Sequence, residues 1–304
     1  MASTFDQFVR FTTDAAGLER TFRLFHALSQ ILYAYALPLH LVTLVFGASA
    51  VRTRAVLLGL RGQLALARRH FRVFRSLESF GAARRLLYPP TPTPSAGGGR
   101  GPGVAVVGWD RWLDGLGRSF NGMYLLLEAS THLDALKVDG LAPWGPAWEA
   151  VLTVEGQRFW LFALACGVLA NLVRVADVVA EASAPRAVQQ GGGVEGKAVK
   201  ERGNEKESLS ASDDDEEKEE EGEKGAARDD HPVWGDPAVR AKIRTLARRA
   251  LSDALDITIP GSIVGWIPAG AGGVGLAMFA TTLLTSIDIW ERCGREVAAA
   301  DGKK

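Results

Sequence analysis

The stretch that most constrains the fold runs from Ile257 to Ile287 and contains 31 consecutive residues without a charged side chain. A helix needs only about 20 apolar residues to cross a hydrocarbon core about 30 Å thick. Two prolines and several glycines make the first part irregular, whereas the second part, VGLAMFATTLLTSIDIW, has the composition of a continuous helix. We therefore predict a C-terminal transmembrane span at about residues 262–290. The alternative is the buried helix of a soluble protein.

Small residues recur at four-residue intervals within this stretch, at Gly261 and Gly265 and again at Ala271 and Gly275. This spacing lets two helix backbones approach each other closely in lipid. The expected helix-packing positions are therefore Gly261, Gly265 and Gly275.

Three further apolar stretches precede the C-terminal span. The stretch from Leu24 to Val51 is interrupted only by two histidines and Pro38, and it is long enough either to span the membrane or to pack against other helices. The stretch from Phe159 to Val173 has 15 residues, which is short for a span and typical of a packed or half-inserted helix. The segment 119–136 carries several ionisable residues and has the pattern of an amphipathic helix inside a bundle.

The segment from Gly59 to Leu87 has the pattern of an amphipathic helix. At about 100° per residue, its arginines and serines occupy one arc, and large apolar and aromatic side chains fill the remainder. Such a helix can lie in a lipid headgroup layer, with guanidinium groups on phosphates and Phe rings among the acyl chains. A core-facing helix with a solvated Arg face is the alternative. The expected membrane-binding residues are Arg61, Leu64, Arg68, Arg69, Phe71, Arg72, Phe74 and Arg75.

Charge is segregated along the chain, although the net charge is zero. Residues 51–87 contain nine Arg and a single acid, Glu78, whereas the acidic run DDDEEKEEEGE occupies residues 213–223. Just before this run, Ser210 and Ser212 each lie three residues ahead of an Asp, the spacing that acid-directed kinases favour. Both are possible phosphorylation sites, and an unregulated spacer is the alternative.

These patterns predict an all-α fold, a membrane-associated helical bundle with amphipathic helices and a C-terminal transmembrane helix. Residues 1–181 form the N-terminal helical region, which includes a Pro/Gly loop at 88–108. Residues 182–232 are expected to be a disordered acidic linker, because they contain almost nothing to bury. Residues 233–304 combine a basic amphipathic helix with the C-terminal span.

Motifs of catalysis are absent from the sequence. The segment GGGRGPG lacks the Lys-Ser/Thr of a phosphate-binding loop, the five histidines show no metal-ligand spacing, and no GxSxG nucleophile elbow occurs. Two cysteines, Cys166 and Cys293, make neither a disulfide framework nor a zinc site. We expect no enzyme, no cofactor and no metal. The Leu- and Phe-rich face of the basic segment and the downstream span also argue against a nucleic-acid partner.

Five segments follow one another in a recognisable order. The opening FDQFVRFTTDAAGLERTFRLFHALSQILYAYAL is followed by LALARRHFRVFRS, with its Leu-x-Leu-x-Arg-Arg core, and by FNGMYLLLEASTHLDALKVDGL. RFWLFALACGVLANLVRVAD and IPGSIVGWIPAGAGGVGLAMFATTLLTSIDIWE come next. Together these segments resemble the peroxin-eleven family of peroxisomal membrane proteins, although Glu128 and Leu133 stand where that family usually has Asp and Trp. The Pro/Gly loop and the acidic linker resemble those of filamentous-fungal members.

This resemblance implies a peroxisomal membrane protein that inserts an amphipathic helix into the cytosolic leaflet. The protein would thereby curve and elongate the membrane and promote fission and proliferation of the organelle. The implied partners are membrane phospholipids, further copies of the chain in a homo-oligomer, a fission adaptor and a dynamin-related GTPase. The alternative is a peroxisomal membrane channel for small metabolites, in which Asp134, Arg174 and Asp177 would line a polar path.

Overall fold

The computed structural model describes residues 4–88, 108–183 and 236–301. These residues form eleven α-helices and no strand, which confirms the predicted all-α fold. The helices before the first gap are α1 (Thr4–Thr13), α2 (Ala15–Ala34), α3 (Ala36–Phe46), α4 (Ala50–His70) and α5 (Arg75–Leu87). The remaining helices are α6 (Trp109–Ser130), α7 (His132–Ala135), α8 (Gly145–Ser183), α9 (Pro237–Asp256), α10 (Thr258–Val264) and α11 (Ala271–Asp301).

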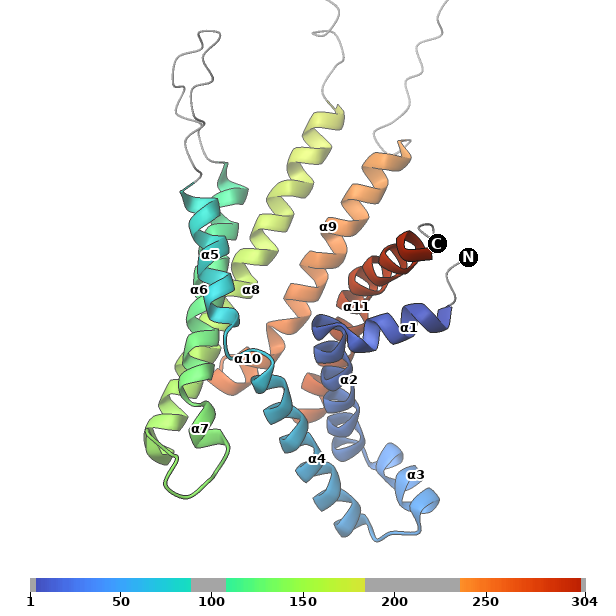
Figure 1. Ribbon diagram of the computed structural model, residues 1–304, viewed down its shortest axis with the longest axis vertical. Helices are drawn as coiled ribbons and strands as arrows, with labels where there is room; N and C mark the ends of the chain where they lie inside the picture. Colours follow the sequence, from blue (N-terminus) through green and yellow to red (C-terminus); the bar gives the residue numbers. More distant parts are fainter. Residues whose placement is uncertain (1–3, 89–107, 184–235, 302–304) are drawn as a thin grey trace, which may run out of the picture.

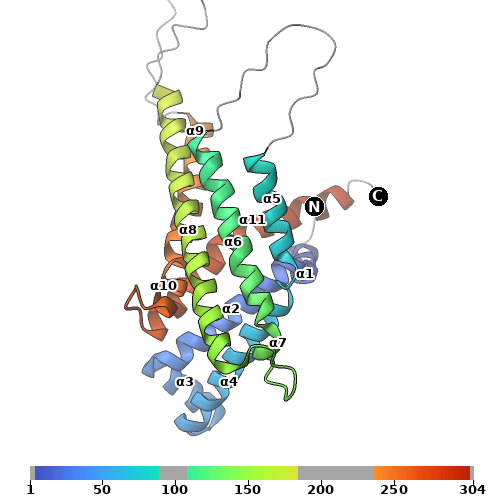
Figure 2. The same cartoon turned by 90° about the vertical axis from the view of Figure 1, so that its left-hand side faces the viewer.

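The helices pack in two groups (Figures 1 and 2). In one group, α6 packs along both α5 and α8, and the short α7 lies at its lower end. In the other group, α2 packs against α11 and α4, and α3 lies beside both α2 and α4. Helix α9 contacts α8 and α11 and so joins the groups, while α4 leads directly into α5 across the same boundary.

The apolar stretch from Leu24 to Val51 is not one straight helix. Helices α2 and α3 meet at an angle of 99°, with Tyr35 in an extended conformation between them. Pro38 explains the position of the break, because its ring cannot follow the carbonyl of Ala34 in a continuous helix and it has no N–H to donate there. The bent pair is therefore either a broken span or a re-entrant hairpin.

The predicted single helix from Gly59 to Leu87 is wrong in its continuity, because the chain leaves α-helical geometry at Phe71–Phe74. The amide groups of Arg72 and Arg75 bond to carbonyls only three residues earlier. The Nε of Arg72 donates to the carbonyl of Arg68 at 3.2 Å, which occupies the acceptor that the Arg72 amide would use in an α-helix. A side chain thus replaces a backbone donor at the break.

Two helices in the described part of the chain are long and apolar enough to cross a membrane, namely α8 and the segment Ala271–Ala300 of α11. The C-terminal span is confirmed, but it begins at Ala271 and not at about residue 262, because Gly265 ends α10 in a left-handed conformation with φ 85°. The stretch Phe159–Val173, which by itself is short for a span, lies within the longer helix α8, which has the length and composition to cross a membrane. The flanking charges remain helical within the 39 residues of α8, where Arg174 binds Asp110 and Asp114 of α6.

Candidate functional site: an apolar end and a buried arginine cluster

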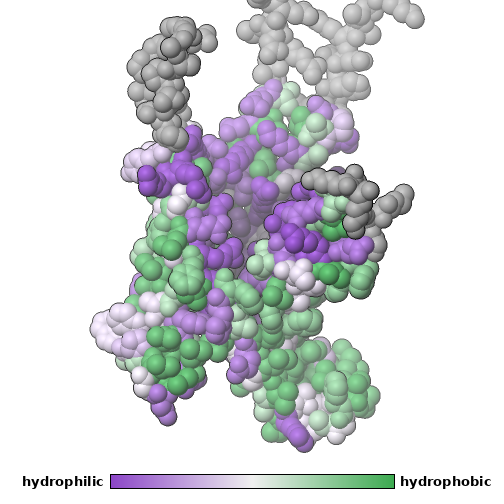
Figure 3. Space-filling view, in the orientation of Figure 1, coloured by the Kyte–Doolittle hydropathy of each residue, from purple (hydrophilic) through white to green (hydrophobic). Residues whose placement is uncertain are grey.

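Helices α3 and α4 expose a set of large apolar side chains at one end of the molecule, here termed the apolar end. Figure 3 shows this end as a hydrophobic region below the polar upper part of the molecule. Phe46 is 76% exposed and Val51 is 80% exposed. Large clusters of exposed apolar side chains are rare on monomeric soluble proteins. The apolar end comprises Leu37, Leu41, Leu44, Val45, Phe46, Val51 and Val56.

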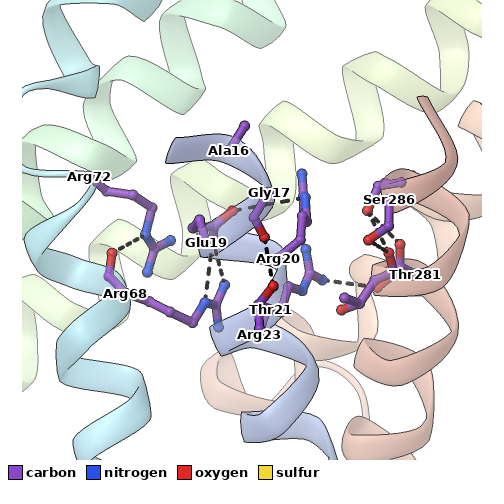
Figure 4. A network of polar contacts seen from close by, with 12 residues as sticks. Ala16, Gly17, Glu19, Arg20, Thr21, Arg23, Arg68, Arg72, Thr281 and Ser286 are labelled. Atoms are coloured by element: carbon purple, nitrogen blue, oxygen red, sulfur yellow. Dashed lines mark hydrogen bonds and ion pairs between the residues drawn. The ribbon is translucent and has the colours of Figure 1, made fainter. Parts of the chain in front are cut away.

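The arginine face of the segment 59–87 points into the molecule (Figure 4). Arg68 reaches Glu19 of α2, with Nη2 3.3 Å from Oε1. Arg72 reaches Glu128 of α6 at 3.0 Å and donates to the hydroxyl of Tyr124 at 2.9 Å. These bonds connect the two groups of helices through the turn between α4 and α5.

A second buried ion pair lies beside the first. Arg23 of α2, only 4% exposed, binds Asp256 at the end of α9 and donates to the hydroxyl of Thr281 on α11 at 3.0 Å. The Thr281 hydroxyl in turn donates to Asp256 at 2.6 Å. Three helices are therefore tied at one polar point, and removal of either charge would leave the other buried and unpaired.

The buried arginine cluster consists of Arg23, Arg68 and Arg72 with the acids that bind them. Burial shifts the pKa values of groups in and beside this cluster. Burial and the neighbouring Arg72 lower the pKa of Arg68 to about 10. Burial also raises the pKa of the Tyr124 phenol to about 12, against the opposing effect of Arg72. At neutral pH the Arg68 guanidinium is therefore charged and the Tyr124 phenol is neutral.

A cavity of about 500 Å³ lies against the cluster. Five arginines line this central cavity, whereas Glu128 is the only acid among the described residues of its lining. The lining also contains a group of apolar side chains: Ile259, Ile263, Val274 and Met278. Two further polar cavities, of about 260 and 400 Å³, share Trp160 with it, and Figure 3 shows a polar hollow between the two groups of helices.

The predicted membrane-binding residues divide between the interior and the surface. Leu64 and Arg68 are buried, Arg61 lines the central cavity, and Arg69 and Arg72 approach Glu128. Arg75, Phe74 and Phe71 are exposed, Phe74 at 80% and Phe71 at 42%, and one face of the Phe71 ring stacks on Phe22 with ring centroids 5.7 Å apart. The expectation that Arg68 and Arg72 lie on lipid phosphates does not fit their bonds to Glu19 and Glu128.

The predicted helix-packing glycines also have different roles. Gly275 lies where α11 meets α2, and an added Cβ would come within 3.1 Å of Ile31. At Gly261 an added Cβ would meet Ile267 at 2.5 Å, so this glycine admits the turn after α10. Gly265 has open space around it and adopts the left-handed conformation that ends α10. Gly261 and Gly265, expected to be helix-packing positions, therefore lie in and directly after the short helix α10, outside the long helix α11.

The three residues proposed for a polar path are not brought together. Asp134 is buried and accepts hydrogen bonds from the amides of Trp144 and Gly145, at the start of α8. Arg174 lies 29 residues after Gly145 on α8, which corresponds to a helical rise of about 44 Å at 1.5 Å per residue. Arg174 is paired with Asp110 and Asp114, and Asp177 is exposed.

The acids that form ion pairs with the buried arginines were not predicted from the sequence. Glu19 and Asp256 belong to helices distant in sequence, 49 positions from Arg68 and 233 from Arg23. The available signal was an acid among apolar residues on each helix, which predicts a buried partner but not its identity. Ser210 and Ser212, the linker 182–232 beyond Ser183, and most of the loop 88–108 lie outside the described residues.

Comparison with known proteins rests on one match. The family model for peroxisomal biogenesis factor 11 (PEX11) matches residues 5–290, nearly the whole chain. No curated protein and no solved structure matches significantly. The matched family consists of non-enzymatic peroxisome biogenesis factors of the organelle membrane. The match extends from the first turn of α1 to Trp290 in α11. The chain therefore belongs to the peroxisomal biogenesis factor 11 family and is a peroxisomal membrane protein.

Proposed function

We propose that this protein curves and elongates the peroxisomal membrane by inserting its apolar end into one leaflet, and thereby promotes fission and proliferation of the organelle. The observation that carries the proposal is the exposure of the apolar side chains on α3 and α4. An amphipathic element that enters one leaflet to a shallow depth expands that leaflet relative to the other. Membrane curvature follows from the difference in area.

The bend between α2 and α3 supports shallow insertion. Helix α3 has only 11 residues, about 16 Å at 1.5 Å per residue, which is half of a hydrocarbon core. The 99° angle at Tyr35 turns α3 away from the axis of α2. A short helix at this angle suits a position in the plane of one leaflet, while α8 and α11 anchor the protein.

The ion pairs of the buried arginine cluster would hold the apolar end in a fixed orientation, so that it enters the leaflet as a rigid wedge. Because Arg68 and Arg72 bind Glu19 and Glu128, α4 is attached to α2 and α6 and cannot rotate freely on the membrane surface. Headgroup attraction in this proposal comes from the exposed Arg52 and Arg54, next to Val51 and Val56. Self-association and contacts with a fission adaptor and a dynamin-related GTPase would concentrate such wedges where the organelle divides.

The test uses the full-length protein reconstituted in vesicles that contain anionic lipid. Leu44→Asp/Phe46→Asp should abolish tubulation seen by electron microscopy, because a carboxylate is strongly disfavoured among acyl chains. Leu251→Asp is the matched control, since Leu251 is 52% exposed on α9, away from the apolar end. Tubulation by the double variant at the wild-type level, or an equal loss in the control, would contradict the proposal.

A metabolite channel is the second candidate, and the adjoining polar cavities are the observation in its favour. Trp160 lines all three of them and stands at their common boundary. If solutes pass through these cavities, the purified protein should give single-channel currents in planar bilayers and Trp160→Ala should raise the conductance. Absence of single-channel currents in wild-type protein that tubulates vesicles would exclude this candidate.

A further inference from the structure

The central cavity is lined by arginine and histidine side chains with nitrogen atoms that lack a hydrogen-bond partner among the described residues. Nε of Arg23, Nη1 of Arg69 and Nδ1 of His26 are buried and have no hydrogen-bond partner among the described residues. The side chain of Arg61 also lines this cavity, and it makes no hydrogen bond or ion pair with any residue that the structure describes. Buried donors without partners are energetically unfavourable, and more so when they are charged.

The excess of arginines over acids is larger in this cavity than in its neighbour. The neighbouring cavity of about 260 Å³ has six arginines but also four acids in its lining: Glu19, Glu78, Asp253 and Asp256. The central cavity has five arginines and only Glu128. Two of its arginines, Arg23 and Arg68, are balanced by Asp256 and Glu19, whereas Arg69 shares Glu128 with Arg72 and Arg61 has no acidic partner among the described residues. An anion would therefore find uncompensated positive charge here.

We propose that the central cavity is a binding site for a phosphate group, held chiefly by Arg61 and Arg69. Guanidinium groups match the oxygen geometry of phosphate and form charge-assisted hydrogen bonds with it. The free Nη1 of Arg69 and the unpaired Arg61 supply donors, and Nδ1 of His26 supplies another in the tautomer that carries its proton there. This site is separate from the apolar end that contacts lipid in the proposed function.

The rest of the cavity constrains what carries the phosphate. Ile259 and Ile263 of α10 and Val274 and Met278 of α11 form an apolar part of the lining. The volume of about 500 Å³ accommodates more than the phosphate group alone. The phosphate could belong to a lipid headgroup with its glycerol and first acyl carbons, or to a soluble phosphate compound, and the experiment separates these sources.

The experiment measures thermal unfolding of the purified full-length protein in neutral detergent at constant ionic strength. One arm titrates inorganic pyrophosphate, and the other titrates short-chain phosphatidic acid, with short-chain phosphatidylcholine and chloride as controls. At least one phosphate arm should raise Tm saturably, as binding to the folded state requires. Stabilisation by phosphatidic acid alone assigns the site to a lipid, and stabilisation by pyrophosphate assigns it to a soluble phosphate.

Two variants localise the binding. Arg61→Gln should weaken the apparent affinity about tenfold, and because the Arg61 side chain is unpaired the fold should persist. Arg244→Gln, at an exposed arginine on α9 that does not line the cavity, is the control and should bind like the wild type. Ala65→Leu keeps every charge but fills part of the cavity, and it should also weaken binding.

Three results would overturn the proposal. The first is the absence of saturable stabilisation in both phosphate arms. The second is equal weakening by Arg244→Gln, which would mean that binding follows surface charge. The third is full binding by Ala65→Leu, which would place the ligand elsewhere and which remains decisive if Arg61→Gln fails to fold.

Discussion

Arg68 of α4 contacts Glu19 of α2 inside the molecule, with Nη2 3.3 Å from Oε1, although the two residues are 49 positions apart. This contact reverses the orientation expected for the basic helix. Arg68 and Arg72, which were expected to face lipid phosphates, hold the bundle together, and several apolar residues of α4, among them Val51 and Val56, face outward. The protein resembles many membrane proteins in this respect, because charges face its interior and apolar side chains face the surroundings.

The first prediction concerns this ion pair. Arg68→Gln should lower the free energy of unfolding by up to about 3–5 kcal/mol, because Glu19 would remain buried with only the more distant Arg20, 3.9 Å away, as a cationic partner. The exposed Arg54→Gln on the same helix should change it by less than about 0.5 kcal/mol. Thermal unfolding of both proteins in the same detergent measures the difference. Equal Tm values for the two variants would show that the pair does not hold α4 to α2.

The second prediction distinguishes two neighbouring phenylalanines. Phe74 is 80% exposed, so Phe74→Asp should leave Tm nearly unchanged but weaken vesicle tubulation. Phe71 stacks on Phe22 of α2, so Phe71→Asp should lower Tm as well. Thermal unfolding and electron microscopy of vesicles are measured on the same preparations. A lower Tm for Phe74→Asp than for Phe71→Asp would contradict the placement of the two rings.

The third prediction concerns the approach of α11 to α2. Gly275→Leu should destabilise the protein by about 1–3 kcal/mol, because even its Cβ would come within 3.1 Å of Ile31. Gly273→Leu is the matched control, since an added Cβ at Gly273 meets nothing within 4 Å. Both variants carry the same loss of a helical glycine, so a difference in Tm reports the contact alone. If the two Tm values agree, α11 does not pack against α2 at this point.

The fourth prediction concerns pH. Burial, followed by the nearby Asp256 and Asp114, raises the pKa of Asp253 on α9 from 3.8 to about 7. The folded protein therefore binds this proton more tightly than the unfolded chain, and stability from this group falls as pH rises from about 4 to 7. Asp253→Asn should remove that part of the pH dependence and raise Tm at pH 8.

Two comparisons check the assignment to Asp253. Thermal unfolding is measured from pH 5 to 8 for the wild type, for Asp253→Asn and for Asp139→Asn, an exposed acid before α8. Asp139→Asn should follow the wild type across this range. A pH profile of Asp253→Asn that runs parallel to that of the wild type would mean that the carboxyl group is already ionised in the folded protein at pH 5.

Local sequence determined which segments are helical and which of them are apolar enough for a membrane. The charge-free run that ends at Ile287 predicts the C-terminal span, because the hydrophobic length is a property of consecutive residues. The order of five short motifs predicts the family. Even the bend between α2 and α3 has a local cause in Pro38, although composition alone did not reveal that the stretch would break there.

Tertiary structure decided which way each helix faces. The amphipathic pattern of α4 defines the angle between its arginine face and its apolar face, but either face can meet lipid or protein. The arginine face meets protein because Arg68 binds Glu19 and Arg72 binds Glu128, acids that lie 49 and 56 positions away in the sequence. Likewise, Arg174 remains within the long helix α8 because Asp110 and Asp114 of α6 neutralise it. A charge in an apolar helix is unfavourable or stabilising according to its partner, and that partner is set by packing between helices distant in sequence.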